Sequence, residues 1–167
     1  MKLDLIDLQQ KDTPAFKKMF QDAFQKGFED KFGKSDLIIL PEKDIDFSLN
    51  HKGSHAYKAV MNNEMVGGVV VVINEETQIN ELHLLCVKND VQSKGIGREI
   101  YFEIERLFPN TKKWTTCTPC FETRNIHFYT EVCGFKITRR YDEIDTPEGF
   151  VGDGGEGMFD LEKEMEK

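Results

Sequence analysis

Two side chains able to accept protons, Glu81 and His83, lie two residues apart in an apolar stretch over residues 79–87. Successive side chains of a strand point to opposite faces, so the alternation predicts one face made of Glu81, His83, Leu85 and Val87. Carboxylates and imidazoles are common general bases, and a partly apolar cleft would raise the pKa of Glu81 toward neutral pH. The pair predicts a proton-transfer site, with a solvated carboxylate and a packed histidine as the alternatives.

A second group of residues that could carry out chemistry is the pair Cys117 and Cys120, which has the spacing of a redox dithiol. The pair stands between an expected strand and an expected helix, where such a dithiol is usually found. It follows three strands, however, whereas thioredoxin-like pairs lie near the start of their fold. Two cysteines supply two metal ligands, and Cys86, Cys133 and the histidines are distant in sequence, so we expect no metal site.

A glycine-containing segment joins the stretch over residues 79–87 to a helix that begins near Gly95. It consists of Gln92, Ser93, Lys94, Gly95, Ile96 and Gly97. The first backbone amides of a helix lack internal partners and carry the positive end of the helix dipole, so they favour a phosphate. Arg98 and Glu99 rule out a Walker loop, and Ile100 replaces the third glycine of a dinucleotide loop. A tight turn with glycine chosen for packing is the alternative.

Two motifs agree in order and spacing with a known family. The first is Gln92-x-x-Gly95-x-Gly97, and the second is Asn125-Ile126-His127-Phe128-Tyr129-Thr130-Glu131-Val132-Cys133-Gly134-Phe135. Together they resemble the GNAT superfamily of N-acetyltransferases. The resemblance is specific over about residues 79–140 and extends loosely to the order of elements elsewhere, while residues 28–60 show no match.

The resemblance implies acetyl-CoA as cosubstrate. Backbone amides of residues 92–97 would bind its pyrophosphate, with added charge from Lys94. Main-chain groups of Cys86 and Val87 would pair with the pantetheine arm between two splayed strands, because unpaired backbone groups gain hydrogen bonds from such a ligand. Asn125 resembles the helix residue of the family that hydrogen-bonds this arm.

The resemblance also implies catalytic roles. Tyr129 matches the tyrosine that points at the cofactor sulfur and protonates the departing thiolate; a core aromatic is the alternative. Glu81 stands where some members carry a glutamate general base, and His83 is the second candidate. A base is needed because an alkyl amine with a pKa near 10.4 is protonated at neutral pH.

The elements that must position these residues follow from hydrophobic periodicity and turn signals. We expect a first strand over residues 3–8, a helix from Thr13 to Gly27 with a further turn to Gly33, and a loop over residues 36–54. Strands are expected over residues 55–61, 65–74, 79–87, 113–118, 135–141 and 158–162, helices over 96–108 and 124–133, and a Gly-rich loop over 146–157. This predicts a single α+β domain over residues 1–167, with a mixed, largely antiparallel sheet of six or seven strands flanked by helices.

Composition excludes several classes of function. The 167 residues are 39% hydrophobic and carry a net charge of −8, and residues 142–167 hold ten acidic and two basic residues. No basic stripe is present, so we expect no nucleic-acid partner. The longest apolar run, residues 69–73, falls far short of the ~18 residues of a membrane span, and we expect a cytoplasmic protein. Four cysteines in a chain of this length do not form a dense disulfide framework.

These observations predict an N-acetyltransferase that moves acetyl from acetyl-CoA to a primary amine by direct attack. The acidic surplus favours a cationic acceptor, either a small-molecule amine or a basic peptide. Two alternatives stay open, namely a dithiol oxidoreductase using Cys117 and Cys120, and a non-catalytic acyl-CoA-binding sensor. A homodimer is compatible with the sequence.

Overall fold

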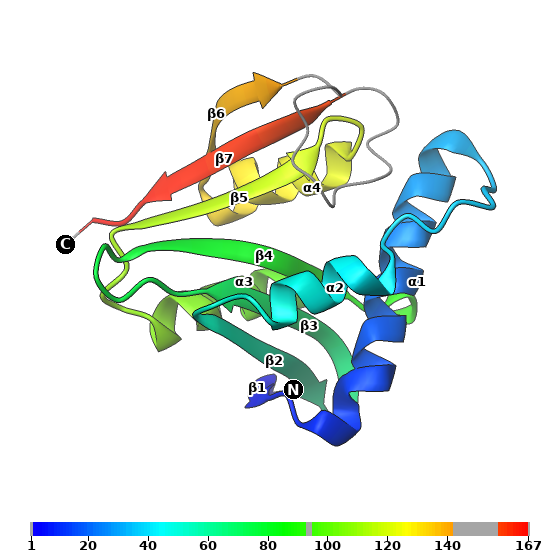
Figure 1. The fold of residues 1–167 in the computed structure, drawn as a ribbon, viewed down its shortest axis with the longest axis horizontal. Helices are drawn as coiled ribbons and strands as arrows, with labels where there is room; N and C mark the ends of the chain where they lie inside the picture. The colour runs from blue at the N-terminus through cyan, green and yellow to red at the C-terminus, as the bar shows by residue number, and fades with distance from the viewer. Residues whose placement is uncertain (1, 93–94, 142–156, 167) are drawn as a thin grey trace.

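The computed structural model describes residues 2–92, 95–141 and 157–166 (Figure 1). Its strands are β1 (Asp4–Asp7), β2 (Ser54–Met61), β3 (Glu64–Val72), β4 (Ile79–Val87), β5 (Lys113–Pro119), β6 (Lys136–Tyr141) and β7 (Met158–Glu164). Its helices are α1 (Thr13–Phe32), α2 (Glu42–Leu49), α3 (Ile96–Leu107) and α4 (Thr123–His127), with 3-10 turns η1 (Gln10–Asp12) and η2 (Asn89–Val91) and a π-helical segment η3 (Phe128–Cys133).

The seven strands form one sheet in the order β1-β2-β3-β4-β5-β7-β6. All neighbouring strands are antiparallel except β4 and β5, which are parallel. Parallel neighbours require a crossover connection, and α3 supplies it. The expected α+β class, with a largely antiparallel sheet of six or seven strands, is confirmed.

Helices cover both faces of the sheet (Figure 1). On one face, Phe16 of α1 and Ile45 of α2 pack with Val70 of β3. On the other face, Ile100 of α3 packs with Trp114 of β5, together with the η3 segment. The two apolar clusters hold the sheet between two layers of helix, which fixes the strand edges where the functional residues lie.

The N-terminal helical region differs from the sequence-based prediction in two ways. Helix α1 continues through Gly27 to Phe32, because Phe28 is buried against Phe121, with ring centroids 5.5 Å apart. Gly27 permits a close approach instead of ending the helix, since a Cβ there would lie 3.1 Å from the Glu122 carboxylate. Helix α2 lies within the predicted loop over residues 36–54; at eight residues it is too short for its apolar period to be recognised.

A β-bulge interrupts β4 at His83. The register with β3 passes from Leu82 directly to Leu84, which leaves His83 as the extra residue. Leu82 belongs to the apolar cluster on the α3 face, whereas Leu84 packs on the face covered by α1 and α2. A bulge re-aims the side chains that follow it, and here it reverses their faces.

The bulge corrects the predicted alternation. Leu85 and Val87 pack against the α3 face, and they do not share a face with Glu81 and His83. His83 contacts Ser48 of α2, and Glu81 contacts His83, so this pair stays together on the opposite face. The expected proximity of Glu81 and His83 is confirmed, and the expected face with Leu85 and Val87 is wrong.

Strands β4 and β5 part after a short paired region. Their register comprises three pairs, which are Ile79 with Lys113, Asn80 with Trp114 and Glu81 with Thr115. Beyond this point the two ribbons diverge in Figure 1. The first carbonyl past the pairing, that of Leu82, accepts a hydrogen bond from the Thr116 hydroxyl at 2.9 Å. The remaining backbone edge of β4 faces an opening.

Other expectations concern the chain as a whole. Of the Gly-rich loop predicted over residues 146–157, Gly157 alone belongs to the described residues. Among the described helices, none combines the length and the apolar content that crossing a bilayer requires. The single domain over residues 1–167 stays a prediction.

Candidate active site

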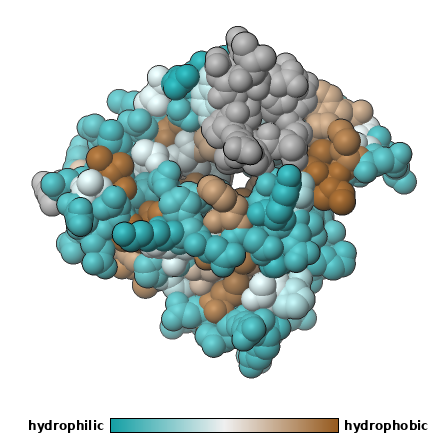
Figure 2. Space-filling model, viewed as in Figure 1, coloured by the Kyte–Doolittle hydropathy of each residue, from teal (hydrophilic) through white to brown (hydrophobic). Residues whose placement is uncertain are grey.

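A cavity of about 1110 Å³ lies where β4 and β5 part. Both strands line it, together with α1 and α2 on one face and the start of α3, α4 and η3 on the other. Figure 2 shows hydrophobic side chains in a hollow near the centre of a mostly hydrophilic face. The cavity joins Gly95 at one end to Glu81 and His83 at the other, so it connects the two sites that were predicted separately from the sequence.

The start of α3 has the geometry of an anion site. Gly95 is its N-cap and has φ +77°, a left-handed conformation that favours glycine. A Cβ at Gly95 would meet no atom within 4 Å from the described residues other than its chain neighbours, so no other described side chain fills the space beside this N-cap. The side chain of Ile96 is buried in the core, so only its backbone amide could contact a bound anion. Gly97 lies beside the ring of Phe128. The predicted residues Ser93 and Lys94 lie outside the described residues.

Gln92 closes the turn that precedes this helix. Its side-chain amide donates to the Val87 carbonyl at 3.1 Å and to Asn89 Oδ1 at 3.3 Å. Its side-chain oxygen accepts a hydrogen bond from Arg124 Nη1 at 3.2 Å. Gln92 therefore ties the end of β4 to α4, and it holds the Arg124 guanidinium at the wall of the cavity. Arg124 was not predicted from the sequence.

The other predicted cofactor residues lie along the same wall. Asn125 of α4 lines the cavity. Cys86 also lines it, but its thiol is buried in the cluster under α1 and α2, and burial raises its pKa well above the ordinary range. The thiol is therefore not a nucleophile, and the role of the Cys86 main chain in binding the cofactor stays a prediction. The Val87 carbonyl already has Gln92 as its partner.

Tyr129 stands in η3, directly after α4. A π-helical turn is rare and often marks a functional site. The side chain is 7% exposed and lines the cavity. Burial raises the pKa of Tyr129 well above that of an ordinary phenol, and a hydrogen bond with Thr116 lowers it by less. The phenol therefore stays protonated at neutral pH and can donate a hydrogen bond into the cavity.

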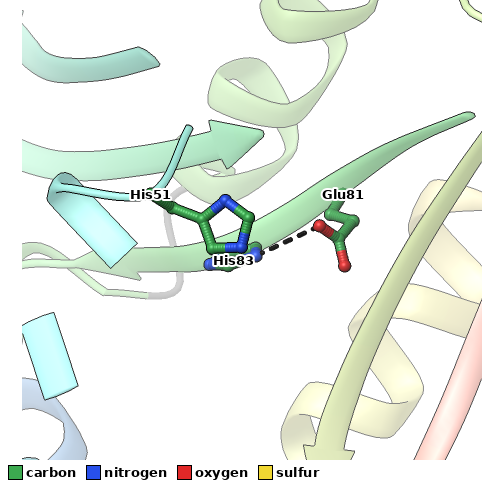
Figure 3. A group of neighbouring side chains, drawn as sticks. All are labelled: His51, Glu81 and His83. Atoms are coloured by element: carbon green, nitrogen blue, oxygen red, sulfur yellow. Dashed lines mark hydrogen bonds and ion pairs between the residues drawn. The ribbon is translucent and has the colours of Figure 1, made fainter. Parts of the chain in front are cut away.

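Glu81 and His83 meet at the end of the cavity next to α2 (Figure 3). His83 Nε2 lies 3.4 Å from Glu81 Oε2, and His83 Nδ1 lies 3.0 Å from Ser48 Oγ. The His51 ring stands edge-on to His83, with centroids 5.2 Å apart. The side chain of His83 is 16% exposed and that of Glu81 is 48% exposed. Four polar side chains thus surround one small region of the cavity.

The electrostatics of Glu81 differ from the prediction. The hydrogen bond with His83 lowers the pKa of Glu81 more than burial raises it, and the charges of His83 and His51 lower it further. The expected rise in the pKa of Glu81 is therefore wrong. At neutral pH this side chain is a carboxylate, which makes it a poor base and a suitable partner for an imidazolium.

Ser48 and His51 were missed in the sequence. They lie at the end of α2 and just beyond it, in the region predicted as loop. Their spacing of three residues places them about one helical turn apart, but this signal has no meaning until a helix is recognised. Their proximity to His83, more than thirty residues away, comes from the packing of α2 across the sheet.

The cysteine pair does not have the properties of a redox dithiol. All four cysteines are free, and Cys117 is part of the cavity wall on β5. Burial, with the nearby charges of Asp160 and Glu81, raises the pKa of Cys117 to about 12. Reactive dithiols need a lowered pKa, because the thiolate is the attacking species. The structure therefore disfavours the dithiol oxidoreductase.

Sequence comparison connects the chain to a family of enzymes. The model of the acetyltransferase (GNAT) family matches residues 13–135. Protein YrkN of Bacillus subtilis (strain 168), described as uncharacterized, is 39% identical over 133 residues, which cover 79% of this chain and 72% of YrkN. The family match, over residues 13–135, includes both the glycine-containing segment and the Tyr129 motif.

Solved structures share the fold. A GNAT family acetyltransferase from Elizabethkingia anophelis with acetyl-CoA bound superimposes with a TM-score of 0.72, at 20% identity, over 98% of each chain. Spermidine N-acetyltransferase from Vibrio cholerae, in complex with CoA and spermine, superimposes with a TM-score of 0.70 at 14% identity, over 97% of this chain and 95% of its own. At these identities the likeness concerns the fold.

Proposed function

The chain belongs to the acetyltransferase (GNAT) family and is an acyltransferase, and on that premise we propose that it transfers acetyl from acetyl-CoA to a cationic primary amine by direct attack. One observation carries the proposal. The opening between β4 and β5 connects the free amide end of α3 at Gly95 to the polar group around His83. A thioester bound along this opening would lie between a phosphate site and a base.

The cofactor end supports binding of coenzyme A. The amide end of α3 is open in front of Gly95, and Arg98 and Arg124 add positive charge to the cavity wall. These features suit a diphosphate, since amides and guanidinium groups bind phosphate oxygens. The fold neighbour from Elizabethkingia anophelis was crystallised with acetyl-CoA. Residues 92–97 and Asn125 would hold the cofactor as the sequence predicted.

The proton-accepting group is His83, with Glu81 as its partner. In the contact with the Glu81 carboxylate, His83 Nε2 donates the hydrogen; when an ammonium takes that place, the hydrogen is carried on Nδ1 and donated to Ser48 Oγ, and the Nε2 lone pair faces the ammonium. A lone pair beside a carboxylate attracts a cation, and an ammonium placed there donates to both groups. The ammonium loses one proton to Nε2, and the resulting imidazolium remains paired with Glu81. Ser48 acts as a positioning residue, because its hydroxyl can accept the hydrogen on Nδ1 and orient the ring.

Acyl transfer then exchanges one bond and releases two protons from the amine. The free amine forms a bond to the thioester carbon, and the carbon–sulfur bond breaks. The nitrogen loses a second proton, which neutralises the thiolate, and His83 returns the first proton to water. Tyr129 donates a hydrogen bond to the departing sulfur. Because the pKa of Tyr129 lies above the value of about 8.5 for a thiol, the phenol keeps its proton and acts by stabilising charge.

The acceptor end favours a cation. Carboxylates from three elements line it, namely Asp44 of α2, Glu81 of β4 and Asp160 of β7. The Asp44 Oδ2 atom is buried and has no hydrogen-bond partner among the described residues, so an unsatisfied acceptor lies in the cavity wall. The spermidine acetyltransferase with the same fold acts on a polyamine. We therefore expect amines with a second positive charge to be preferred over amines that carry a carboxylate.

The cofactor assignment is tested by thermal unfolding with and without acetyl-CoA. At a ligand concentration of 100 times the dissociation constant, the stabilisation is about 2.7 kcal/mol. For a chain of this size the melting temperature then rises by roughly 5–10 °C. An unchanged melting temperature at millimolar acetyl-CoA would refute coenzyme A binding and the proposed function with it.

The enzymatic role is tested by thiol release from acetyl-CoA with a panel of amines. We expect His83→Gln to lower kcat about 100-fold, since a general base contributes 10²–10⁴, and to leave the dissociation constant of acetyl-CoA unchanged. His55→Gln is the matched control, because His55 is exposed on β2 and packs on Phe108 outside the cavity. Acetyl-CoA binding without turnover on any amine would favour the acyl-CoA-binding sensor.

A further inference from the structure

The structure brings together a set of metal ligands that the sequence keeps apart. His51 follows α2, whereas Glu81 and His83 lie on β4 (Figure 3). One ligand atom from each of the three side chains lies within 4.8 Å of the other two. Two imidazole nitrogens and one carboxylate form a frequent ligand set of catalytic zinc sites. Within residues 2–92, 95–141 and 157–166, no other group of three such residues is this close.

The second nitrogen of each imidazole is held by an oxygen. His51 Nδ1 lies 3.1 Å from the Lys52 carbonyl, which can only accept, so His51 carries hydrogen on Nδ1 and a lone pair on Nε2. His83 Nδ1 lies 3.0 Å from Ser48 Oγ, which can accept in the same way. Metal-bound histidines nearly always donate their other ring nitrogen to an oxygen, because this contact fixes the tautomer and the ring orientation. His51 already has this arrangement, and His83 adopts it when the metal displaces the hydrogen that Nε2 donates to Glu81.

The spacing suits a small divalent ion. Ligands about 2.0–2.1 Å from a tetrahedral zinc ion lie roughly 3.3 Å from each other, and the His83 Nε2 and Glu81 Oε2 atoms are 3.4 Å apart. The most distant pair of ligand atoms, which lie within 4.8 Å of each other, has to close by up to about 1.5 Å. His51 is partly exposed on a short connection after α2, which allows this movement. The fourth position faces the cavity.

From these contacts we propose that His51, Glu81 and His83 bind one Zn²⁺ ion through the two Nε2 atoms and the Glu81 carboxylate. The site replaces our sequence-based expectation of no metal. Binding of the ion does not depend on the proposed acetyl transfer. Its consequence rests on that function: Zn²⁺ would occupy the Nε2 lone pair of His83, so it would block the proton transfer and inhibit the enzyme.

Direct binding tests the site without any substrate. Titration of the chain with Co²⁺ as a spectroscopic probe, followed by displacement with Zn²⁺, should give one ion per chain with the spectrum of nitrogen and oxygen ligands. His51→Gln should weaken binding at least tenfold, and Ser48→Ala about tenfold, because loss of an outer partner typically costs 10–100-fold in metal affinity. His55→Gln, which removes a histidine outside the cluster, should bind like the wild type.

Three outcomes would overturn the site. They are unchanged affinity in His51→Gln, a thiolate-to-cobalt band that places the ion on cysteine, and no binding to the wild type at millimolar metal. Circular dichroism and acetyl-CoA binding of His51→Gln verify that its fold is intact. If the metal binds as expected but acetyl-CoA produces no thermal shift, the site stands and the proposed acetyl transfer fails.

Discussion

Individual residues in this protein derive their chemistry from their immediate neighbours. Glu81 and Asp44 both line the acceptor end of the cavity, yet the hydrogen bond with His83 lowers the pKa of Glu81, whereas burial raises that of Asp44. The same principle applies to Tyr129, whose burial keeps the phenol protonated. A base, a charged partner and a hydrogen-bond donor thus arise from ordinary side chains, because each environment favours one protonation state.

The role of Tyr129 leads to a prediction at this scale. Tyr129→Phe removes the hydrogen bond to the departing thiolate, and bonds to charged groups are worth about 1.5–3 kcal/mol. We therefore expect kcat to fall roughly 10–100-fold while the dissociation constant of acetyl-CoA stays constant. Steady-state thiol release and acetyl-CoA titration measure the two quantities. Tyr57→Phe, on β2 outside the cavity, is the control, and an equal loss in both variants would argue against a role for Tyr129.

At the scale of elements, the ends and irregularities of secondary structure form the site. The N-terminus of α3 supplies unpaired amides, the bulge in β4 at His83 turns Leu85 and Val87 to the other face, and the π-helical η3 carries Tyr129. Regular helices and strands satisfy their own backbone groups internally. The interruptions are therefore the places where backbone groups and re-aimed side chains become available to a ligand.

The substitution Gly95→Ala tests whether the N-terminus of α3 binds the phosphate groups of the cofactor. An alanine in a left-handed conformation costs about 1–2 kcal/mol, and its Cβ would also project into the open space where phosphate is expected. We expect Gly95→Ala to lower stability by about 1 kcal/mol and to weaken acetyl-CoA binding about tenfold. Gly134→Ala is a matched control, because Gly134 has φ +92° at the end of η3 and lies outside the cavity wall. Scanning calorimetry should show a similar loss of stability in the two variants, and titration calorimetry should show weaker acetyl-CoA binding in Gly95→Ala alone. Equal acetyl-CoA affinity in the two variants would show that Gly95 does not form part of the phosphate site.

On the scale of the whole molecule, the sheet is continuous at one end and open at the other. Strands β1 to β4 and strands β5 to β7 are joined through three register pairs between β4 and β5. Asn80 lies within this junction and is fully buried. Its side chain accepts a hydrogen bond from the Asn74 amide at 2.8 Å and donates to the Thr111 hydroxyl at 2.7 Å. This residue connects the loop before β4 to the loop before β5 and holds the opening at a fixed place.

Replacement of Asn80 should therefore affect the stability of the molecule. Asn80→Ala removes the part-buried hydrogen bond from the Asn74 backbone amide and the buried hydrogen bond to the Thr111 hydroxyl, and each such bond is worth about 0.5–1.5 kcal/mol. We expect the free energy of unfolding to fall by about 2 kcal/mol and the melting temperature by roughly 4–8 °C. Asn50→Ala, at an exposed position after α2, should change either value little. Denaturant unfolding of both variants provides the measurement, and equal stability would show that Asn80 does not secure the junction.

The amino-acid sequence by itself determined the elements whose signals are local. The apolar period from Ile96 to Leu107, the glycine at position 95 and the alternation of the strands depend on neighbouring residues, and the structure contains these elements close to their predicted bounds. The fold class followed from the order of these elements, and the family resemblance followed from two local motifs. Helix α2 and the continuation of α1 were missed, because burial of Ile45 and Phe28 depends on partners that are remote in sequence.

Tertiary structure alone decided how the site is assembled. Local pattern predicts strict alternation in β4, but pairing with β3 introduces the bulge at His83. Packing of α2 across the sheet brings Ser48 and His51 to His83, and the parting of β4 from β5 produces the cavity. Distances between residues remote in sequence are set by the packing of whole elements, so no local pattern contains them. The predicted base and the proposed zinc site are both consequences of that packing.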